Sequence, residues 1–263
     1  MAKLIAIHGK KRSGKGTIGR FLVEQNGFEH VVISRTLKNM TNVLLKNAID
    51  MEKTNAKLFD FTDGDLKEKP ILGFNNRSTR DLMIWIGAHF AQSILSTLWI
   101  DITMREIDNY LSKGKSVYVD NIRLFPEFDA LKAKGAALWA VVSDYHYKTL
   151  PGQNDYSISM NDLTWTQVIT TEACQEMIAI LFEAMDRPEE IAGFNASVCA
   201  ELLWNVLSDG VTGGYDNEPP PTERPLDLQQ FHLLHNVGTV SKLEDDVSHL
   251  LRETPDYVCV SKE

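Results

Sequence analysis

The sequence predicts an α/β fold: a three-layer α/β/α sandwich with a mostly parallel central sheet and a mostly helical insertion. Three observations support this. Short apolar runs alternate with stretches of helical periodicity, which is typical of βαβ units. A glycine-bearing loop joins the first apolar run to the first helical stretch. The alternation stops after residue 144 and resumes near residue 231, which indicates an insertion.

The first third of the chain is expected to contain two strands, two helices and one long polar excursion. After the glycine-bearing loop, Ile18, Phe21 and Leu22 have the spacing of one helical face. The excursion contains proline, glycine and asparagine, so we expect a mobile segment without regular structure that could act as a substrate flap. The expected elements are strands over residues 3–8 and 31–34, helices over residues 15–25 and 36–45, and the excursion over residues 50–77.

The rest of the core follows the same alternation. Apolar residues at helical spacing continue from Arg80 to Leu98, and a glycine between two lysines closes the next helix. Two buried strands follow, separated by a short helix that Gly135 ends. The expected elements are helices over residues 80–98, 100–111, 126–134, 171–185, 195–207 and 242–251, and strands over residues 116–120, 137–143 and 231–235.

These elements divide the chain into three parts. We expect the first part of a nucleotide-binding core over residues 1–150, a helical insertion or lid over residues 151–226, and the last strand and closing helix of the core over residues 227–263. The run Pro219-Pro220-Pro221 lies in a connector at the end of the insertion. The insertion could cover a substrate or form a homodimer contact, and the sequence leaves both open.

Composition narrows the class of protein. The 263 residues are 43% hydrophobic and 24% charged, as in ordinary globular proteins. The net charge of −9 argues against a nucleic-acid partner, since proteins that neutralise many phosphates are usually basic. No apolar run has the length of a membrane span or signal peptide. The three cysteines have no metal-site spacing, which fits reduced thiols in a cytoplasm; they are Cys174, Cys199 and Cys259.

The strongest motif is the loop Gly9-Lys10-Lys11-Arg12-Ser13-Gly14-Lys15-Gly16-Thr17, a variant of the P-loop pattern G-x-x-x-x-G-K-[ST]. It follows a strand and opens a helix, so its backbone N–H groups and the helix N-terminus form an anion cradle. Lys15 supplies a charge for the β- and γ-phosphates of ATP, and Thr17 reaches Mg²⁺ directly or through water. Gly14 and Gly16 let phosphate oxygens approach the backbone. A chance glycine–lysine turn is the alternative, and the strand–loop–helix context argues against it.

A second candidate cluster follows the predicted strand over residues 116–120. Asp120 lies at the carboxyl end of that strand, where α/β sheets place their ligands. It could accept a hydrogen bond from an acceptor or from Mg²⁺-bound water, while Arg123 could hold a phosphate with two hydrogen bonds. The alternative interpretation is a helix N-cap followed by an exposed arginine.

Two further arginines are candidates for phosphate contacts. Arg80 begins a helix, where a positive charge is unfavourable to the helix dipole, which suggests a bound anion nearby. A solvated surface charge is the alternative for Arg80. Arg187 beside Pro188 is the candidate lid arginine, and Arg224 is the weaker choice because it lies in the proline-rich connector.

Four segments together resemble the bacteriophage-type deoxynucleoside monophosphate kinases. They are GKKRSGKGT, TRDLMIWIG with the later Leu98-Trp99, VDNIRLFPE with the following LKAKGA, and HNVGT with Leu243. They cover residues 1–147 and 227–252. The chain departs from the family pattern at Gln92, where the family often has an arginine, and at Leu124, where it has an aromatic residue. Residues 151–226 are also longer than the usual lid.

The resemblance implies a P-loop kinase that transfers phosphate from ATP to a deoxynucleoside monophosphate with Mg²⁺, in the cytoplasm of a host if a phage encodes it. It implies that Lys15 and Thr17 contact the donor and that Arg80, Asp120 and Arg123 face the monophosphate. It also implies that residues from Asn236 to Thr239 lie near the donor base. Two rivals remain: a P-loop kinase that acts on another acceptor, such as a modified base in DNA, and a nucleotide-binding regulatory protein without turnover.

Overall fold

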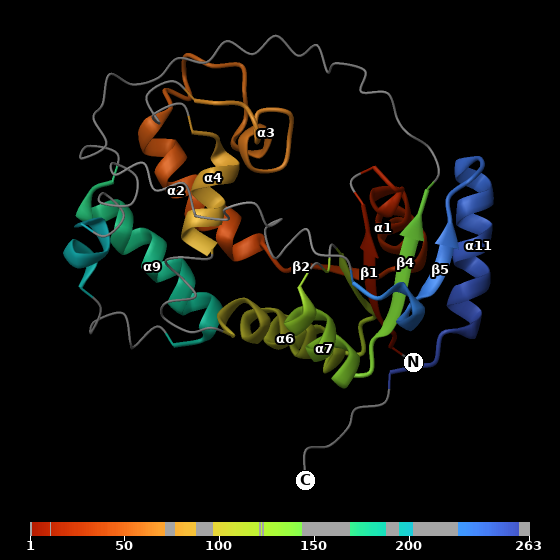
Figure 1. The fold of residues 1–263 in the computed structure, drawn as a ribbon. Helices are drawn as coiled ribbons and strands as arrows, with labels where there is room; N and C mark the ends of the chain where they lie inside the picture. The colour runs from red at the N-terminus through yellow and green to blue at the C-terminus, as the bar shows by residue number, and fades with distance from the viewer. Residues whose placement is uncertain are drawn as a thin grey trace. The chain divides into compact units, whose positions relative to one another are not determined.

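The computed structural model describes residues 2–10, 12–71, 77–87, 97–120, 122, 124–143, 169–187, 195–201 and 226–257 (Figure 1). The chain forms two compact units. The first contains residues 1–33, 99–148 and 217–263, and the second contains residues 34–98 and 149–216. The second unit therefore joins two stretches that are far apart in the sequence. The boundaries expected at residues 150 and 226 stay predictions.

The first unit is built on a five-stranded sheet with the order β2-β3-β1-β4-β5. Each described pairing is parallel, so β1 lies in the middle with β3 on one side and β4 on the other. The carboxyl ends of all these strands therefore meet at one edge of the sheet. The strands are β1 (Leu4–Gly9), β2 (Glu29–Val32), β3 (Val117–Asp120), β4 (Ala137–Val142) and β5 (His232–His235).

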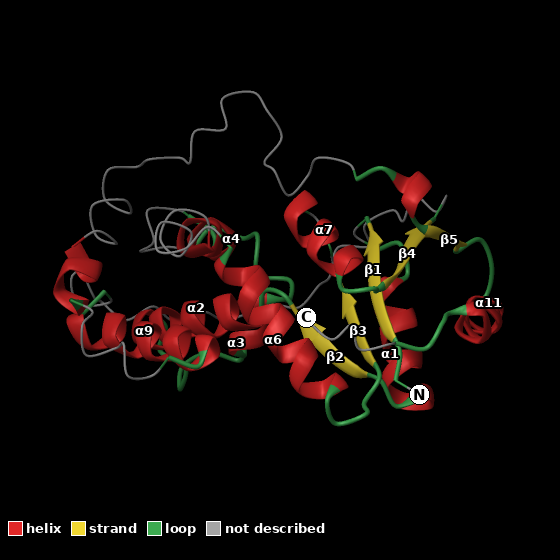
Figure 2. Cartoon of the chain, turned by 90° about the horizontal axis from the view of Figure 1, so that it is seen from below, coloured by secondary structure: helices red, strands yellow, loops and turns green. Residues whose placement is uncertain are grey.

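Helices cover both faces of this sheet, which confirms the predicted α/β/α sandwich; Figure 2 shows α7 and α11 on opposite sides. On one face Ile5 and Ile7 pack with apolar residues of α1 and α11, while on the other Leu4 and Ala6 pack with residues of α6 and α7. Alternate residues of a strand point to opposite faces, so β1 is apolar throughout. The helices are α1 (Lys15–Asn26), α6 (Leu98–Leu111), α7 (Phe125–Ala133) and α11 (Val240–Glu253).

The second unit is helical in its described parts. The long helices α2 (Arg35–Ala48) and α9 (Thr171–Met185) pack against each other, and the short helices α3 (Leu58–Thr62) and α4 (Thr79–Ile84) pack against α2. The Thr170 side chain caps α9 by accepting a hydrogen bond from the N–H of Ala173. A helix over residues 171–185 is what the sequence predicted.

Two cysteines lie inside the second unit. Cys174 of α9 and Cys199 are both free and buried, and their thiols lie close enough to affect each other's ionisation. This contact lowers the pKa of Cys174, and the same contact together with burial raises the pKa of Cys199. Cys259, the third thiol expected to be reduced, lies outside the described residues.

Several predicted elements differ from the structure. The expected strand over residues 31–34 is two residues too late, since β2 spans Glu29–Val32. The expected helix over residues 80–98 begins as α4 and continues as a π-helical turn over residues 85–87. Residues 88–96 lie outside the described part, so the end of this helix stays a prediction. The excursion over residues 50–77 was expected to lack regular structure, and this was wrong. It contains α3, whose Phe61 is buried, and two further apolar side chains of the excursion, Leu66 and Ile71, are buried as well.

Within the described residues, no helix is both long enough and apolar enough to cross a bilayer.

Candidate functional site

The loop between β1 and α1 has the backbone geometry that its glycines allow. Gly14 is the N-cap of α1 and has φ 108°, in the left-handed region that disfavours any residue with a Cβ. Its carbonyl oxygen accepts hydrogen bonds from the N–H groups of Thr17 at 3.0 Å and Ile18 at 3.1 Å. Because α1 begins at Lys15, the first N–H groups of the helix have no acceptor within the helix. They face the end of the loop and provide donors for an anion.

Lys15 is a structural part of the loop as well as a charge. It is the first residue of α1, as the sequence predicted, and is half-buried. Its ammonium group donates hydrogen bonds to the carbonyl oxygens of Gly9 at 2.5 Å and Lys10 at 2.7 Å. The side chain folds back across the loop, because these carbonyls offer the ammonium group acceptors. Lys15 thus stabilises the conformation of the loop and also places a positive charge beside it.

A residue that follows the edge strand β5 also contacts this loop. Asn236 follows β5, and its Nδ2 donates a hydrogen bond to the Ser13 carbonyl oxygen at 2.9 Å. Its own N–H donates to the carbonyl oxygen of Val142 at 2.8 Å. A Cβ added to Gly14 would lie 2.5 Å from Asn236 Nδ2, so a larger residue does not fit there. Asn236 thus ties the ends of β4 and β5 to the loop.

Other loop residues leave polar groups or space at the surface of the cradle. The Ser13 hydroxyl is buried and has no hydrogen-bond partner among the described residues. Gly16 is exposed, and a Cβ there would meet no atom of the described part of the chain within 4 Å. Thr17 is half-buried, and Arg12 is exposed with φ 66°. The cradle therefore offers a buried hydroxyl and open room beside the backbone at Gly16, which suits a phosphate group.

Asp120 ends β3, the strand that pairs with β1. In the register Asp120 lies opposite Ile7, which belongs to the sheet face covered by α1 and α11. Asp120 Oδ1 is buried and lies 3.2 Å from His30 Nε2, while the side chain as a whole is 31% exposed. The carboxylate therefore shares one face of the sheet with the helix that begins at Lys15.

His30 and Tyr118 form the surroundings of this carboxylate. The His30 ring stacks on the Tyr118 ring with centroids 4.3 Å apart and planes 10° apart. Burial and the nearby negative charge of Asp120 raise the pKa of Tyr118 well above its usual value. Sequence reasoning missed His30, because nothing in a short strand marks a histidine as the neighbour of an acid on another strand.

Arg123 lies outside the described residues, but its neighbours are anchored. The Ile122 carbonyl oxygen lies 2.7 Å from His8 Nδ1, and Ile122 itself is fully buried. On the other side the N–H of Leu124 donates to the Glu127 carboxylate at 3.0 Å, which caps α7. His8 was not among the residues singled out from the sequence.

Arg80 and Arg187, both in the second unit, are at the surface. Arg80 lies in the first turn of α4, and its guanidinium group is 3.3 Å from the Glu68 carboxylate in an open ion pair. Arg187 is exposed and follows Asp186, which ends α9 with φ 59°. The predicted phosphate contacts of both arginines stay predictions.

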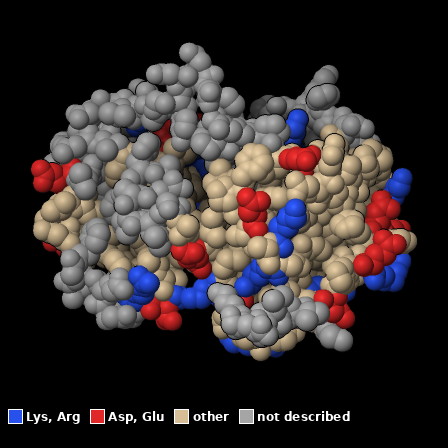
Figure 3. Space-filling model, turned by 60° about the horizontal axis from the view of Figure 1, so that its bottom comes forward, with Lys and Arg blue, Asp and Glu red and all other residues tan. Residues whose placement is uncertain are grey.

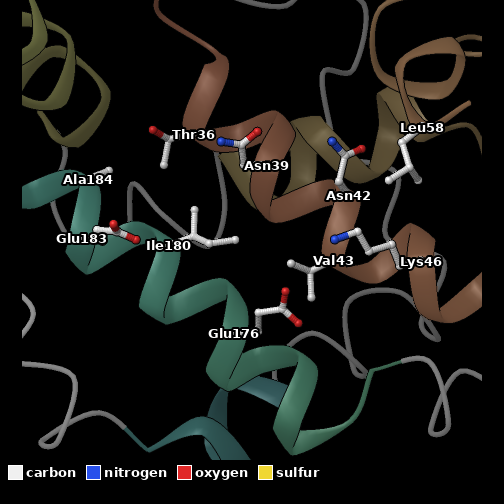
Figure 4. Close-up of a pocket in the computed structure, with 10 residues that line it drawn as sticks. All are labelled: Thr36, Asn39, Asn42, Val43, Lys46, Leu58, Glu176, Ile180, Glu183 and Ala184. Carbon is white, nitrogen blue, oxygen red and sulfur yellow. The ribbon is translucent and has the colours of Figure 1, made fainter.

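The second unit also has a groove of its own, between α2 and α9 (Figure 4). Its volume of about 570 Å³ lies in the range of small-molecule sites. Asn39 and Asn42 come from α2, Glu176 and Glu183 come from α9, and Lys46 is the basic side chain of the lining. Within the described part of the chain, Asn42 Oδ1 is buried without a hydrogen-bond partner. The lining is richer in acceptors than in donors, which suits a ligand that carries amino groups.

Comparisons with known proteins do not show which family this chain belongs to. No protein-family model matches it, and no curated protein matches it. Among solved structures the chain is similar to the dephospho-CoA kinase from Campylobacter jejuni, at 12% sequence identity and a TM-score of 0.38. The match covers 96% of this chain and 97% of that chain. A likeness this distant carries no statement about activity, which has to be argued from the site.

Proposed function

We propose that this chain is an ATP-dependent kinase that converts deoxynucleoside monophosphates to diphosphates. The observation that carries the proposal is the loop between β1 and α1. It has a left-handed glycine at the helix start, a lysine bound across it and an asparagine that braces it. The acceptor class rests on the four segments that resemble the phage-type kinases.

The donor side follows from this geometry. The N-terminus of α1 and the Lys15 ammonium group place positive charge where the β- and γ-phosphates of ATP would bind. Phosphoryl transfer leaves little covalent chemistry to the protein. An oxygen of the acceptor phosphate forms a bond to the γ-phosphorus, while the bond to the bridging oxygen breaks and ADP leaves with its electrons. Lys15 stabilises the charge of the transferred group, and no catalytic histidine is required.

Magnesium fits the side chains that the site offers. Thr17 lies in the first turn of α1, and the Asp120 carboxylate is on the sheet face that α1 covers, with Oδ1 buried and the rest of the side chain partly open. Both are hard oxygen donors of the kind that Mg²⁺ prefers. Bound with ATP, the ion would neutralise negative charge on the phosphate oxygens. Thr17 and Asp120 would hold it directly or through water.

The acceptor side depends on arginines. Arg123 and Arg80 would fix the acceptor phosphate, and Arg187 would complete the site from the insertion. The ion pair between Arg80 and Glu68 is open to solvent, with side-chain exposures of 32% and 52%, so exchanging Glu68 for a phosphate costs little. Asn236 braces the loop, which supports its assignment to the donor side.

A kinase acting on a base in DNA is the first rival. Such an enzyme needs a basic channel for the phosphate backbone. On the face drawn in Figure 3, acidic and basic side chains of the described residues alternate without a continuous basic surface. Together with the net charge of −9, this favours a small acceptor. The second rival is a nucleotide-binding protein without turnover, and the assay described next distinguishes it from a kinase.

A coupled assay of ADP release tests the proposal, with ATP and each ribo- and deoxynucleoside monophosphate offered in turn. We expect ADP release that requires one or more deoxynucleoside monophosphates, and ³¹P NMR should show the matching diphosphate. The Lys15→Ala variant is the control for a contaminating host kinase. ATP binding without ADP release for any monophosphate would favour the regulatory protein. Release that requires DNA would favour the first rival.

A further inference from the structure

The His30–Asp120 contact connects two strands on the face that carries the proposed donor site. In the register His30 lies opposite Tyr118, and Asp120 lies opposite Val32. His30 and Asp120 are therefore diagonal neighbours on one face, within reach of long side chains. The distance of 3.2 Å between His30 Nε2 and Asp120 Oδ1 shows that the two side chains meet.

The two oxygens of Asp120 have different surroundings. Oδ1 is buried 3.2 Å from His30 Nε2, in an ion-pair contact without the geometry of a hydrogen bond, although the whole side chain is 31% exposed. The exposed part of the side chain therefore does not include Oδ1, which leaves Oδ2 as the carboxylate oxygen that can be open to solvent. A carboxylate held by one oxygen keeps the other in a fixed direction, which matters if that oxygen faces an ion or its bound water.

The His30 ring is itself held in place by a chain of contacts that reaches α1. It stacks on Tyr118, and a Cβ added to Gly19 of α1 would lie 2.5 Å from the Tyr118 hydroxyl oxygen. Gly19 thus allows Tyr118 to lie directly against the helix that opens at Lys15. These contacts link the helix of the phosphate loop, through Tyr118 and His30, to the acid on β3.

We infer that His30 is a positioning residue, which holds Asp120 by Oδ1 so that Oδ2 faces the metal–nucleotide complex. The inference rests on the proposed function, because it assumes that the loop binds ATP with a divalent ion. His30 touches neither nucleotide nor metal and acts through Asp120. Such outer contacts typically change metal affinity by about 10- to 100-fold when they are removed.

Binding of Mn²⁺ tests the inference without relying on turnover. Mn²⁺ replaces Mg²⁺ as a paramagnetic probe, and free Mn²⁺ is measured by EPR in the presence of a non-hydrolysable ATP analogue. We expect His30→Phe, which keeps a ring to stack on Tyr118, to weaken Mn²⁺ binding by about tenfold or more. Binding of the analogue without metal should change by less than about twofold, because Lys15 and the loop remain. His30→Gln, which keeps an N–H donor, should recover most of the Mn²⁺ affinity.

Controls separate positioning from folding and from the proposed function. His249→Phe makes the same change on the exposed side of α11 and should leave Mn²⁺ binding unaltered. A His30→Phe protein with normal melting and normal Mn²⁺ affinity would overturn the inference. If His30→Phe does not fold, Tyr118→Leu removes the stacking surface instead, and unchanged Mn²⁺ affinity there would overturn the inference too. A wild-type protein that binds no analogue would refute the proposed function itself, whereas a normal Mn²⁺ affinity in Asp120→Asn would refute the metal role of Asp120, and with it the inference about His30.

Discussion

Substituting alanine at two glycines of the loop should have opposite effects on folding. Gly14→Ala places a Cβ 2.5 Å from Asn236 Nδ2, too close for any real contact. The hydrogen bond from Asn236 to the Ser13 carbonyl is then lost, which costs about 0.5–1.5 kcal/mol. Alanine at φ 108° adds strain of about 1–3 kcal/mol. We expect Gly14→Ala to lower the free energy of unfolding by about 2–4 kcal/mol.

Gly16→Ala is the matched comparison. Gly16 lies in α1, and its added Cβ would meet no protein atom within 4 Å. Alanine is the better helix former, so the free energy of unfolding should stay level or rise by up to about 1 kcal/mol. The added methyl group occupies the open side of the loop, so ATP affinity should fall by about tenfold, a loss of about 1.4 kcal/mol.

Urea unfolding followed by tryptophan fluorescence measures the first effect, because Trp139 is buried in the core that borders the loop. Equilibrium binding of ATP measures the second. Adding Asn236→Ala to Gly14→Ala should lower stability little further, because the hydrogen bond from Asn236 is already lost in Gly14→Ala and the backbone strain is unchanged. A Gly14→Ala protein as stable as the wild type would refute the geometry of the loop. A Gly16→Ala protein with normal ATP affinity would show that the loop is not a phosphate site.

Four more predictions follow from the site and the second unit. Lys15→Ala should remove most turnover and, because two hydrogen bonds to the loop are lost, lower the melting temperature slightly. Arg123→Ala should raise the KM for the monophosphate by a factor equivalent to about 1.5–3 kcal/mol, with the KM for ATP as control. Glu68→Gln should lower that KM and Arg80→Ala should raise it; equal KM values would exclude Arg80 from the acceptor site. Hydrogen exchange should find residues 171–185 protected without nucleotide at every protein concentration, because α9 is buried against α2; protection of these residues only with nucleotide bound would show that α9 moves as part of a lid.

Local patterns in the sequence were enough to predict most of the first unit. The strand–loop–helix at Gly14 and Lys15 is encoded by neighbouring residues, and β1 is apolar throughout because both of its faces are buried. The second strand was placed too late because Glu29 and His30, at the edge of the sheet, are polar. Edge strands need fewer apolar residues, so their ends are harder to recognise.

Contacts between distant segments could not be predicted in the same way. The helix α3 was missed because it is only five residues long, and its one buried apolar residue, Phe61, lies in a largely polar stretch. The contact between His30 and Asp120 depends on which strands pair and in which register. Residues next to His30 and Asp120 in the sequence indicate neither the strand pairing nor the register. The contact between the two side chains is therefore seen only in the folded structure.

The packing of α9 on α2 has a consequence for how the chain folds during its synthesis. The apolar face of α2, which includes Met40 and Leu44, leaves the ribosome long before the residues of α9 that cover it. Until α9 is synthesised, the apolar face of α2 has to stay exposed to solvent or be covered by another segment or a chaperone. Folding is also slow when it depends on contacts between segments that are distant in the sequence. The central strand β1 likewise waits for β3 and β4. Nascent chains stopped before Thr171 should therefore bind chaperones strongly, while chains extended beyond Glu253 should be released.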